Sequence, residues 1–131
     1  MKGILVTALF ILNTASFAAW SNDTVLRQAY KLHKSDFQIQ GFGQVERLLP
    51  DDKQGDNHQK FIIRLSSRQT ILIAHNIDLA PRIADLQVGD TIEFYGEYEW
   101  SQQGGVIHWT HHDPKKLRAG GWLIHNGKKY Q

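Results

Sequence analysis

The residues of this 131-residue chain that are best suited to chemistry lie near its end, where histidine and tryptophan are concentrated. Residues 104–131 read GGVIHWTHHDPKKLRAGGWLIHNGKKYQ and hold four of the seven histidines and two of the four tryptophans. Imidazole nitrogens can bind transition metals or transfer protons near neutral pH, and indole rings can stack on ligands. The segment therefore indicates a binding surface, a catalytic site or a metal centre.

A histidine-bound metal ion is one interpretation. Imidazoles from different strand ends could converge and bind a divalent transition metal such as zinc, with a carboxylate as a further ligand. The predicted ligands are His75, His108, His111 and His112, and Asp113 could add an oxygen. Along an extended strand His108 and His112 lie about 13 Å apart, so the chain must bend near Thr110 for them to share an ion. Ordinary surface or hydrogen-bonded histidines are the alternative.

Acid–base catalysis is a second interpretation. Glu97 and Glu99 share a face of one predicted strand with His108 on the next, so a carboxylate could orient the imidazole and raise its pKa. The pattern predicts a nuclease-like or esterase-like hydrolase, with or without a metal ion. Its catalytic residues would be His108, His111 and Asp113. Cross-strand Glu–His pairs are also common on solvent-facing sheets, and no nucleophile motif accompanies this pair.

A non-catalytic ligand-binding face needs the least special geometry. Aromatic, cationic and amide side chains on a small β-barrel can contact the bases, sugars or phosphates of an extended ligand. The predicted binding residues are His58, Lys60, Arg64, His75, Asn76, Tyr95, Glu97 and Glu99. We therefore expect a binding module first and a hydrolase second. The ligand would be extended and polar or anionic, an oligosaccharide, a nucleic acid or an envelope protein.

These side chains must be positioned mainly by strands. Alternation of apolar and polar residues predicts five strands, at residues 37–49, 58–66, 70–75, 91–100 and 106–111. A one-sided apolar stripe predicts a packing helix at residues 21–34, and Asp78 and Pro81 favour a short helix within residues 76–86. The order predicts a mainly β protein, a five-stranded OB-like Greek-key barrel with an N-terminal helix and a short helix between strands 3 and 4. An open antiparallel sandwich is the alternative.

Apolar residues near the end of the chain complete this picture. Trp100 and Trp109 fall on the apolar sides of their strands and are expected in the core. Trp122, Leu123, Ile124 and Tyr130 are expected to seal the barrel against water.

Residues 1–19 are typical of a secretory signal peptide, because Lys2 precedes a short apolar run and small residues follow at Ser16 and Ala18. The run is shorter than the roughly 20 residues that span a bilayer, so we expect no membrane span. Residues 20–131 would form a single OB-like domain, periplasmic or secreted, without disulfides because the chain has no cysteine. The formal net charge of only +2 removes the simplest electrostatic argument for a nucleic-acid ligand.

Several motifs resemble one bacterial family. They are AHNIDLAPR at residues 74–82, YGEYEW at 95–100, HWTHHDP at 108–114, GWL at 121–123 and YQ at 130–131. Through these motifs nearly the whole mature chain resembles the exported bacterial domain-of-unknown-function family numbered 3465. The resemblance implies an OB-like fold and a periplasmic or secreted location, and it implies no activity. The chain departs from the family's pattern at Arg118, near which a histidine often stands.

Overall fold

The computed structural model describes residues 14–131, with side chains from Asn22 onward. This part of the chain forms one helix and seven strands. They are α1 (Thr14–Lys31), β1 (Phe37–Asp52), β2 (His58–Arg64), β3 (Thr70–Asn76), β4 (Thr91–Glu99), β5 (Val106–His108), β6 (Trp122–His125) and β7 (Lys128–Tyr130). The predicted signal peptide at residues 1–19 lies outside the residues with described side chains and stays a prediction.

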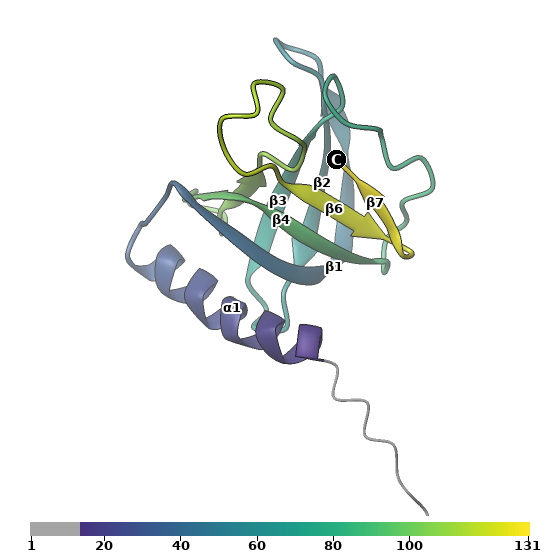
Figure 1. The fold of residues 1–131 in the computed structure, drawn as a ribbon. Coiled ribbons are helices and arrows are strands. Elements are labelled where there is room, and N and C mark those ends of the chain that lie inside the picture. Colours follow the sequence, from purple (N-terminus) through teal and green to yellow (C-terminus); the bar gives the residue numbers. More distant parts are fainter. Residues whose placement is uncertain (1–13) are drawn as a thin grey trace, which may run out of the picture.

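Five of the strands close into a ring (Figure 1). The ring runs β1-β2-β3-β5-β4 and returns to β1, with β3 and β5 parallel and the other pairs antiparallel. β1 can take part in two pairs because it is 16 residues long: residues 37–44 pair with β4, and residues 44–52 pair with β2. β6 and β7 form a hairpin that joins the ring through β4. The prediction of a mainly β protein is confirmed.

The interior of the ring is filled by alternate residues of the strands. On β4 the side chains of Ile92, Phe94 and Tyr98 are fully buried, while those of Glu93, Tyr95 and Glu97 are partly exposed. Leu123 of β6 and Tyr130 of β7 add to the same core, as predicted for the end of the chain. The other two tail residues expected to seal the ring, Trp122 and Ile124, are only partly buried.

Glycine takes the remaining inward position of β4. A Cβ atom at Gly96 would lie 2.5 Å from the carbonyl oxygen of His108, so only glycine lets β5 approach β4 this closely. The position therefore sets where His108 lies relative to the neighbouring residues of β4.

Helix α1 covers one end of the ring, at the turn between β2 and β3 (Figure 1). Leu26 and Ala29 are buried against the core, and the Gln69 amide donates to the Leu26 carbonyl at 3.3 Å. The helix ends at Lys31 rather than at residue 34, because His33 adopts a left-handed φ of 53°. Within residues 14–131, α1 is the only helix, and it is not apolar enough over its length to cross a membrane.

The predicted short helix within residues 76–86 is wrong, since residues 77–90 form turns and irregular structure. Apart from the bond from the Ala80 N–H to the Asn76 carbonyl, at 3.1 Å, the backbone groups of Pro81 and Ile83 bind side chains from the ring. Gln59 donates to the Ile83 carbonyl and accepts from the Ile83 N–H, both at 2.9 Å, and the Pro81 carbonyl accepts from His75 at 2.9 Å. These tertiary contacts replace the hydrogen bonds that a helix would form internally.

Candidate functional site

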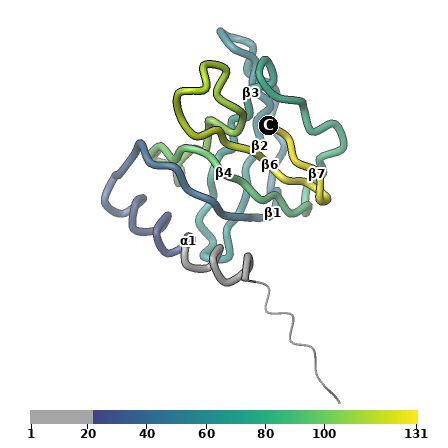
Figure 2. The backbone as a smooth tube through the Cα atoms, viewed as in Figure 1, coloured from purple at the N-terminus to yellow at the C-terminus, as the bar shows by residue number. Residues whose placement is uncertain are grey.

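Residues 109–121 form a loop, hereafter the 109–121 loop, which leaves the sheet after β5 and returns to it at β6 (Figure 2). The loop begins at Trp109, whose φ of 59° ends β5 at His108 instead of residue 111. It closes where the Gly121 N–H donates to the His111 carbonyl at 2.7 Å. A Cβ atom at Gly121 would lie 1.9 Å from the Trp109 carbonyl oxygen, so this closure requires glycine.

His75 of β3 holds the beginning of the 109–121 loop from inside the protein. Its Nε2 lies 2.9 Å from the Pro81 carbonyl oxygen and its Nδ1 lies 2.7 Å from the Thr110 hydroxyl. Since a carbonyl can only accept, Nε2 carries the proton, and Nδ1 of the neutral ring accepts from Thr110. Burial lowers the pKa of His75 below its ordinary value of 6.5, which favours this neutral form.

Asp113 organises the outer part of the same loop. Its carboxylate accepts hydrogen bonds from the backbone N–H groups of Lys115, Leu117 and Arg118, at 3.0, 2.9 and 3.0 Å. These three bonds hold the pKa of Asp113 below its ordinary range, and the bond from the Lys115 N–H has the largest effect. The carboxylate therefore acts as an anionic cap for the turn that follows it.

The loop places Arg118 between an aromatic ring and a carboxylate. The guanidinium carbon lies 4.2 Å from the centre of the Trp109 ring, and a guanidinium nitrogen lies 3.0 Å from Glu97 Oε2. The Trp109 indole N–H donates to the Ala119 carbonyl at 2.9 Å, which ties the two sides of the loop together. Arg118 is thus fixed by a cation–π contact and an ion pair at the same time.

Glu97, Glu99 and His108 form a cluster, hereafter the Glu–His cluster, on the outer face of β4 and β5. His108 Nε2 lies 3.3 Å from Glu99 Oε1 and 3.9 Å from Glu97 Oε2. The register explains the contact, because Glu97 is directly opposite His108 and Glu99 is opposite Val106. In residues 22–131 this is the only group of three or more histidine and acidic side chains with ligand atoms close enough to hold one metal ion.

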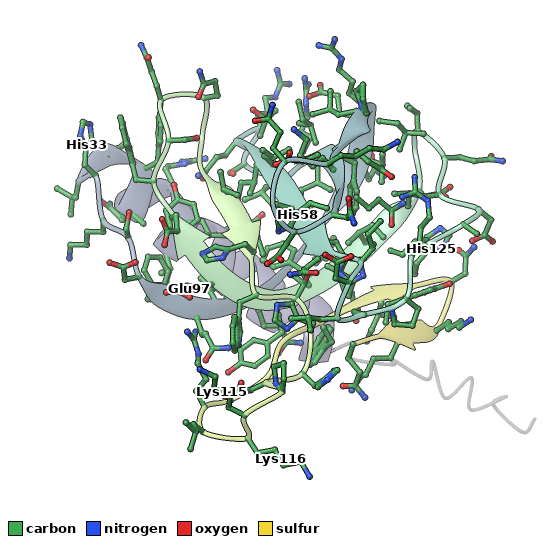
Figure 3. All side chains as sticks on the ribbon, turned by 90° about the horizontal axis from the view of Figure 1, so that it is seen from above. His33, His58, Glu97, Lys115, Lys116 and His125 are labelled. Atoms are coloured by element: carbon green, nitrogen blue, oxygen red, sulfur yellow. The ribbon has the colours of Figure 1, made fainter. Side chains whose placement is uncertain are left out.

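A polar pocket of about 420 Å³, hereafter the loop pocket, lies between the 109–121 loop and the C-terminal hairpin. Its walls include three basic side chains, those of His112, Lys116 and Arg118, together with Asp113 and the aromatic ring of Trp122. Lys115 and Lys116 project from the outer end of the loop (Figure 3). The Asp113 carboxylate keeps its negative charge, but its oxygens are engaged by backbone N–H groups, whereas Lys116 and Arg118 bring two permanent positive charges to the pocket.

A second hollow, hereafter the apolar groove, lies on the outer face of β2, β3 and β5. It has a volume of about 260 Å³. Its apolar walls come from Leu49, Ile62, Leu72 and Val106, and the turn between β4 and β5 adds Ser101 and Gln103. The groove occupies the face on which the sequence predicts ligand binding, but its lining is more apolar than expected.

The family model described as "Protein of unknown function (DUF3465)" matches residues 8–131. The chain belongs to this family. The resemblance inferred from the HWTHHDP and GWL motifs is thereby confirmed, and the family description assigns no activity. No curated protein matches the chain.

The histidines predicted to bind a metal ion do not come together at one point in the structure. His75 uses both ring nitrogens in hydrogen bonds, and His111 Nδ1 lies 2.7 Å from the His112 carbonyl oxygen. The predicted metal ligands His75, His108, His111 and His112 therefore form no ligand cluster in residues 22–131. The predicted catalytic residues are also divided: His108 faces the glutamates, whereas His111 and Asp113 bind backbone groups of the loop.

The predicted binding residues are spread over several parts of the surface. Arg64 pairs with Glu46, and His75 and Asn76 are buried, with Asn76 accepting from the Asp78 N–H at 2.9 Å. His58 and Lys60 are partly exposed on β2, and Figure 3 shows His58 well separated from Glu97 and Lys116. Tyr95, Glu97 and Glu99 share the outer face of β4, and the Tyr95 ring lies 6.0 Å from that of Trp122. Of the partly exposed residues, this last group lies beside the 109–121 loop, and the buried His75 contacts the loop from inside through Thr110.

Three residues of the site were not among those predicted from the sequence. Lys116, Arg118 and Trp122 line the loop pocket, and the basic run KKLR directly after the HWTHHDP motif was the available signal. Of the two tryptophans expected in the core, only one packs against it. Trp100 packs against the core and stacks on His33 at 4.0 Å, whereas Trp109 lies partly exposed beneath Arg118.

Proposed function

We propose that this protein is an exported binding module that holds an anionic group of its ligand, a phosphate or a carboxylate, in the loop pocket. One observation carries the proposal: His112, Lys116 and Arg118 line the pocket, while the oxygens of its one acidic side chain, Asp113, are engaged by backbone N–H groups of the loop. Lysine and arginine charges that face a hollow attract anions more strongly than the same charges on an open surface.

The pairing of the strands supports an OB-like barrel as the fold of this module. The ring has five strands, a parallel β3–β5 pair and closure between β4 and β1. OB-folds bind extended ligands over strands 2 and 3 and beside the connection between strands 4 and 5, where the apolar groove lies.

The groove and the loop pocket are connected by neighbouring residues. Val106 of the groove is paired with Glu99, His108 with Glu97, and Glu97 contacts Arg118 of the pocket. An extended ligand, an oligosaccharide or a nucleic acid, can therefore place its less polar part in the groove and its anionic group in the pocket.

Calorimetric titration of the exported protein with an acidic oligosaccharide and with a single-stranded oligonucleotide tests the proposal. We expect binding of one of the two that weakens as salt is added, because the contact is ionic. Lys116→Gln should weaken binding by about 10-fold, the equivalent of roughly 1.4 kcal/mol. Lys53→Gln, which removes an exposed lysine outside the pocket, is the matched control. Failure of both ligands to bind, or equal losses in the two variants, would contradict the proposal.

A hydrolase of the nuclease or esterase type is the second candidate, and the contact between His108 and Glu99 favours it. In this version His108 is the general base, the nearby Glu99 carboxylate stabilises its protonated form electrostatically, and Arg118 stabilises negative charge on the substrate. Hydrolysis of bis(p-nitrophenyl) phosphate or p-nitrophenyl acetate that is lost in His108→Gln and retained in His112→Gln would support this candidate over the binding module.

The periplasmic or secreted location remains part of the proposal. It is supported by the charge and hydropathy pattern of residues 1–19. Mass spectrometry of the full-length chain after expression should show cleavage near Ala19, and an intact N-terminus would contradict export by this route.

A further inference from the structure

The Glu–His cluster has the composition and the spacing of a metal site. It offers one imidazole nitrogen and two carboxylate oxygens, all within 4.8 Å of one another. Bonds of about 2.0–2.2 Å at a tetrahedral angle place two ligand atoms about 3.3–3.6 Å apart. The 3.3 Å separation between His108 Nε2 and Glu99 Oε1 matches this spacing, and the 3.9 Å separation to Glu97 Oε2 needs only a small side-chain adjustment.

The backbone fixes the positions from which these ligands project. Glu97 and Glu99 lie two residues apart on β4, so both point to the same outer face. His108 reaches that face from β5, which lies close to β4 because Gly96 has no side chain to separate the two strands. Ligands on paired strands are held more precisely than ligands on loops.

One ring nitrogen of the cluster lacks a hydrogen-bond partner. His108 Nε2 is shielded from solvent and makes no hydrogen bond within residues 22–131, because its 3.3 Å approach to Glu99 does not have hydrogen-bond geometry. A buried polar atom without a partner costs free energy unless a ligand satisfies it. A metal ion between this nitrogen and the two carboxylates would do so.

The local charge also favours a cation. The cluster has two carboxylates, and Arg118, 3.0 Å from Glu97, neutralises only one of them. The remaining negative charge attracts a cation to the cluster. The alternative is a protonated His108 between the two glutamates without any metal, and the experiment below separates these two states.

We propose that Glu97, Glu99 and His108 bind a divalent transition metal, with zinc as the expected ion. Zinc binds both imidazole nitrogen and carboxylate oxygen, and three protein ligands leave one coordination position open for water or a ligand. None of its three ligands lines the loop pocket, although Arg118 lines that pocket and pairs with Glu97.

Zinc titration of the exported protein, purified without a histidine tag and stripped of metal, tests this site. We expect one zinc ion per chain, an affinity at least 10-fold lower in Glu99→Gln and in His108→Gln, and no change in His112→Gln. We expect Glu99→Gln to fold normally because this side chain is 45% exposed, and circular dichroism checks this directly. Cobalt substituted for zinc should give the visible absorption of a four- or five-coordinate ion, which Glu99→Gln should abolish.

Two results would overturn the metal site. One is the absence of stoichiometric zinc binding by the wild-type protein, which would leave a protonated His108 as the explanation of the cluster. The other is zinc binding that His112→Gln removes and His108→Gln does not, which would assign the metal to the exposed histidine of the 109–121 loop. Neither result bears on the loop pocket, whose test uses anionic ligands and a lysine variant.

Discussion

The environment of His75 predicts that mild acid destabilises this protein through a single imidazole. The ring is completely buried, and its neutral form is hydrogen-bonded at both nitrogens, to Pro81 and Thr110. Burial lowers the pKa of His75 from 6.5 in the folded state, so the unfolded chain binds a proton at a higher pH than the folded protein does. The stabilisation is therefore complete above pH 6.5 and is lost as the pH falls from there through the folded-state pKa. One proton gives a slope of about 1.4 kcal/mol per pH unit in that interval.

Urea unfolding of the wild type and of His75→Gln, measured at several pH values between about 5 and 8, tests this reasoning. Glutamine keeps a donor and an acceptor but does not titrate. Above the interval the variant should be less stable by roughly 1–3 kcal/mol, because the shorter side chain leaves Pro81 or Thr110 poorly paired. The difference should shrink as the pH falls, since only the wild type loses stability through this residue. Thr110→Ser keeps the hydroxyl and should keep the wild-type slope. Parallel stability curves for the wild type and His75→Gln would refute the argument.

Further substitutions test the other contacts that shape the site. Gly96→Ala should cost about 1–3 kcal/mol in thermal or urea unfolding, because its Cβ atom would lie 2.5 Å from the His108 carbonyl oxygen, and unchanged stability would show that β5 can move away freely. Gln59→Leu should cost a similar amount, roughly 1–3 kcal/mol, because it leaves the buried N–H and carbonyl of Ile83 unpaired. Asp113→Asn should speed hydrogen exchange of the 109–121 loop amides and leave those of β2 and β3 unchanged, since it weakens the carboxylate cap.

The strands could be predicted from the sequence because period-two alternation depends on local side-chain chemistry alone. On β4 the alternation of Ile92, Phe94 and Tyr98 with polar residues gave the inward face correctly. The close approach of β5 at Gly96 is visible only in the structure. The helix expected within residues 76–86 failed for a non-local reason. Its backbone groups bind the Gln59 side chain from β2, and no pattern within residues 76–86 carries that information.

The histidine-rich segment shows why residue types near one another in sequence need not share one site. Alternation correctly predicted that His108 shares a face with Glu97 and Glu99, since all three lie on paired regular strands. It could not follow the chain beyond Trp109, whose positive φ turns the backbone out of the sheet. From that point the polar side chains are used to build the loop: His111 binds the next carbonyl and Asp113 caps the following turn.

Because these residues shape the 109–121 loop, they determine the position of Arg118, which lies outside the histidine motif. The contacts of Thr110, His111 and Asp113 hold the loop in the shape that places Arg118 over Trp109 and against Glu97. A substitution in the HWTHHDP motif can therefore affect ligand binding without removing a ligand-contacting group. For such variants, ligand binding and hydrogen exchange of the loop amides should be measured together. A residue contacts the ligand only if its substitution weakens binding while the exchange rates of the loop stay unchanged.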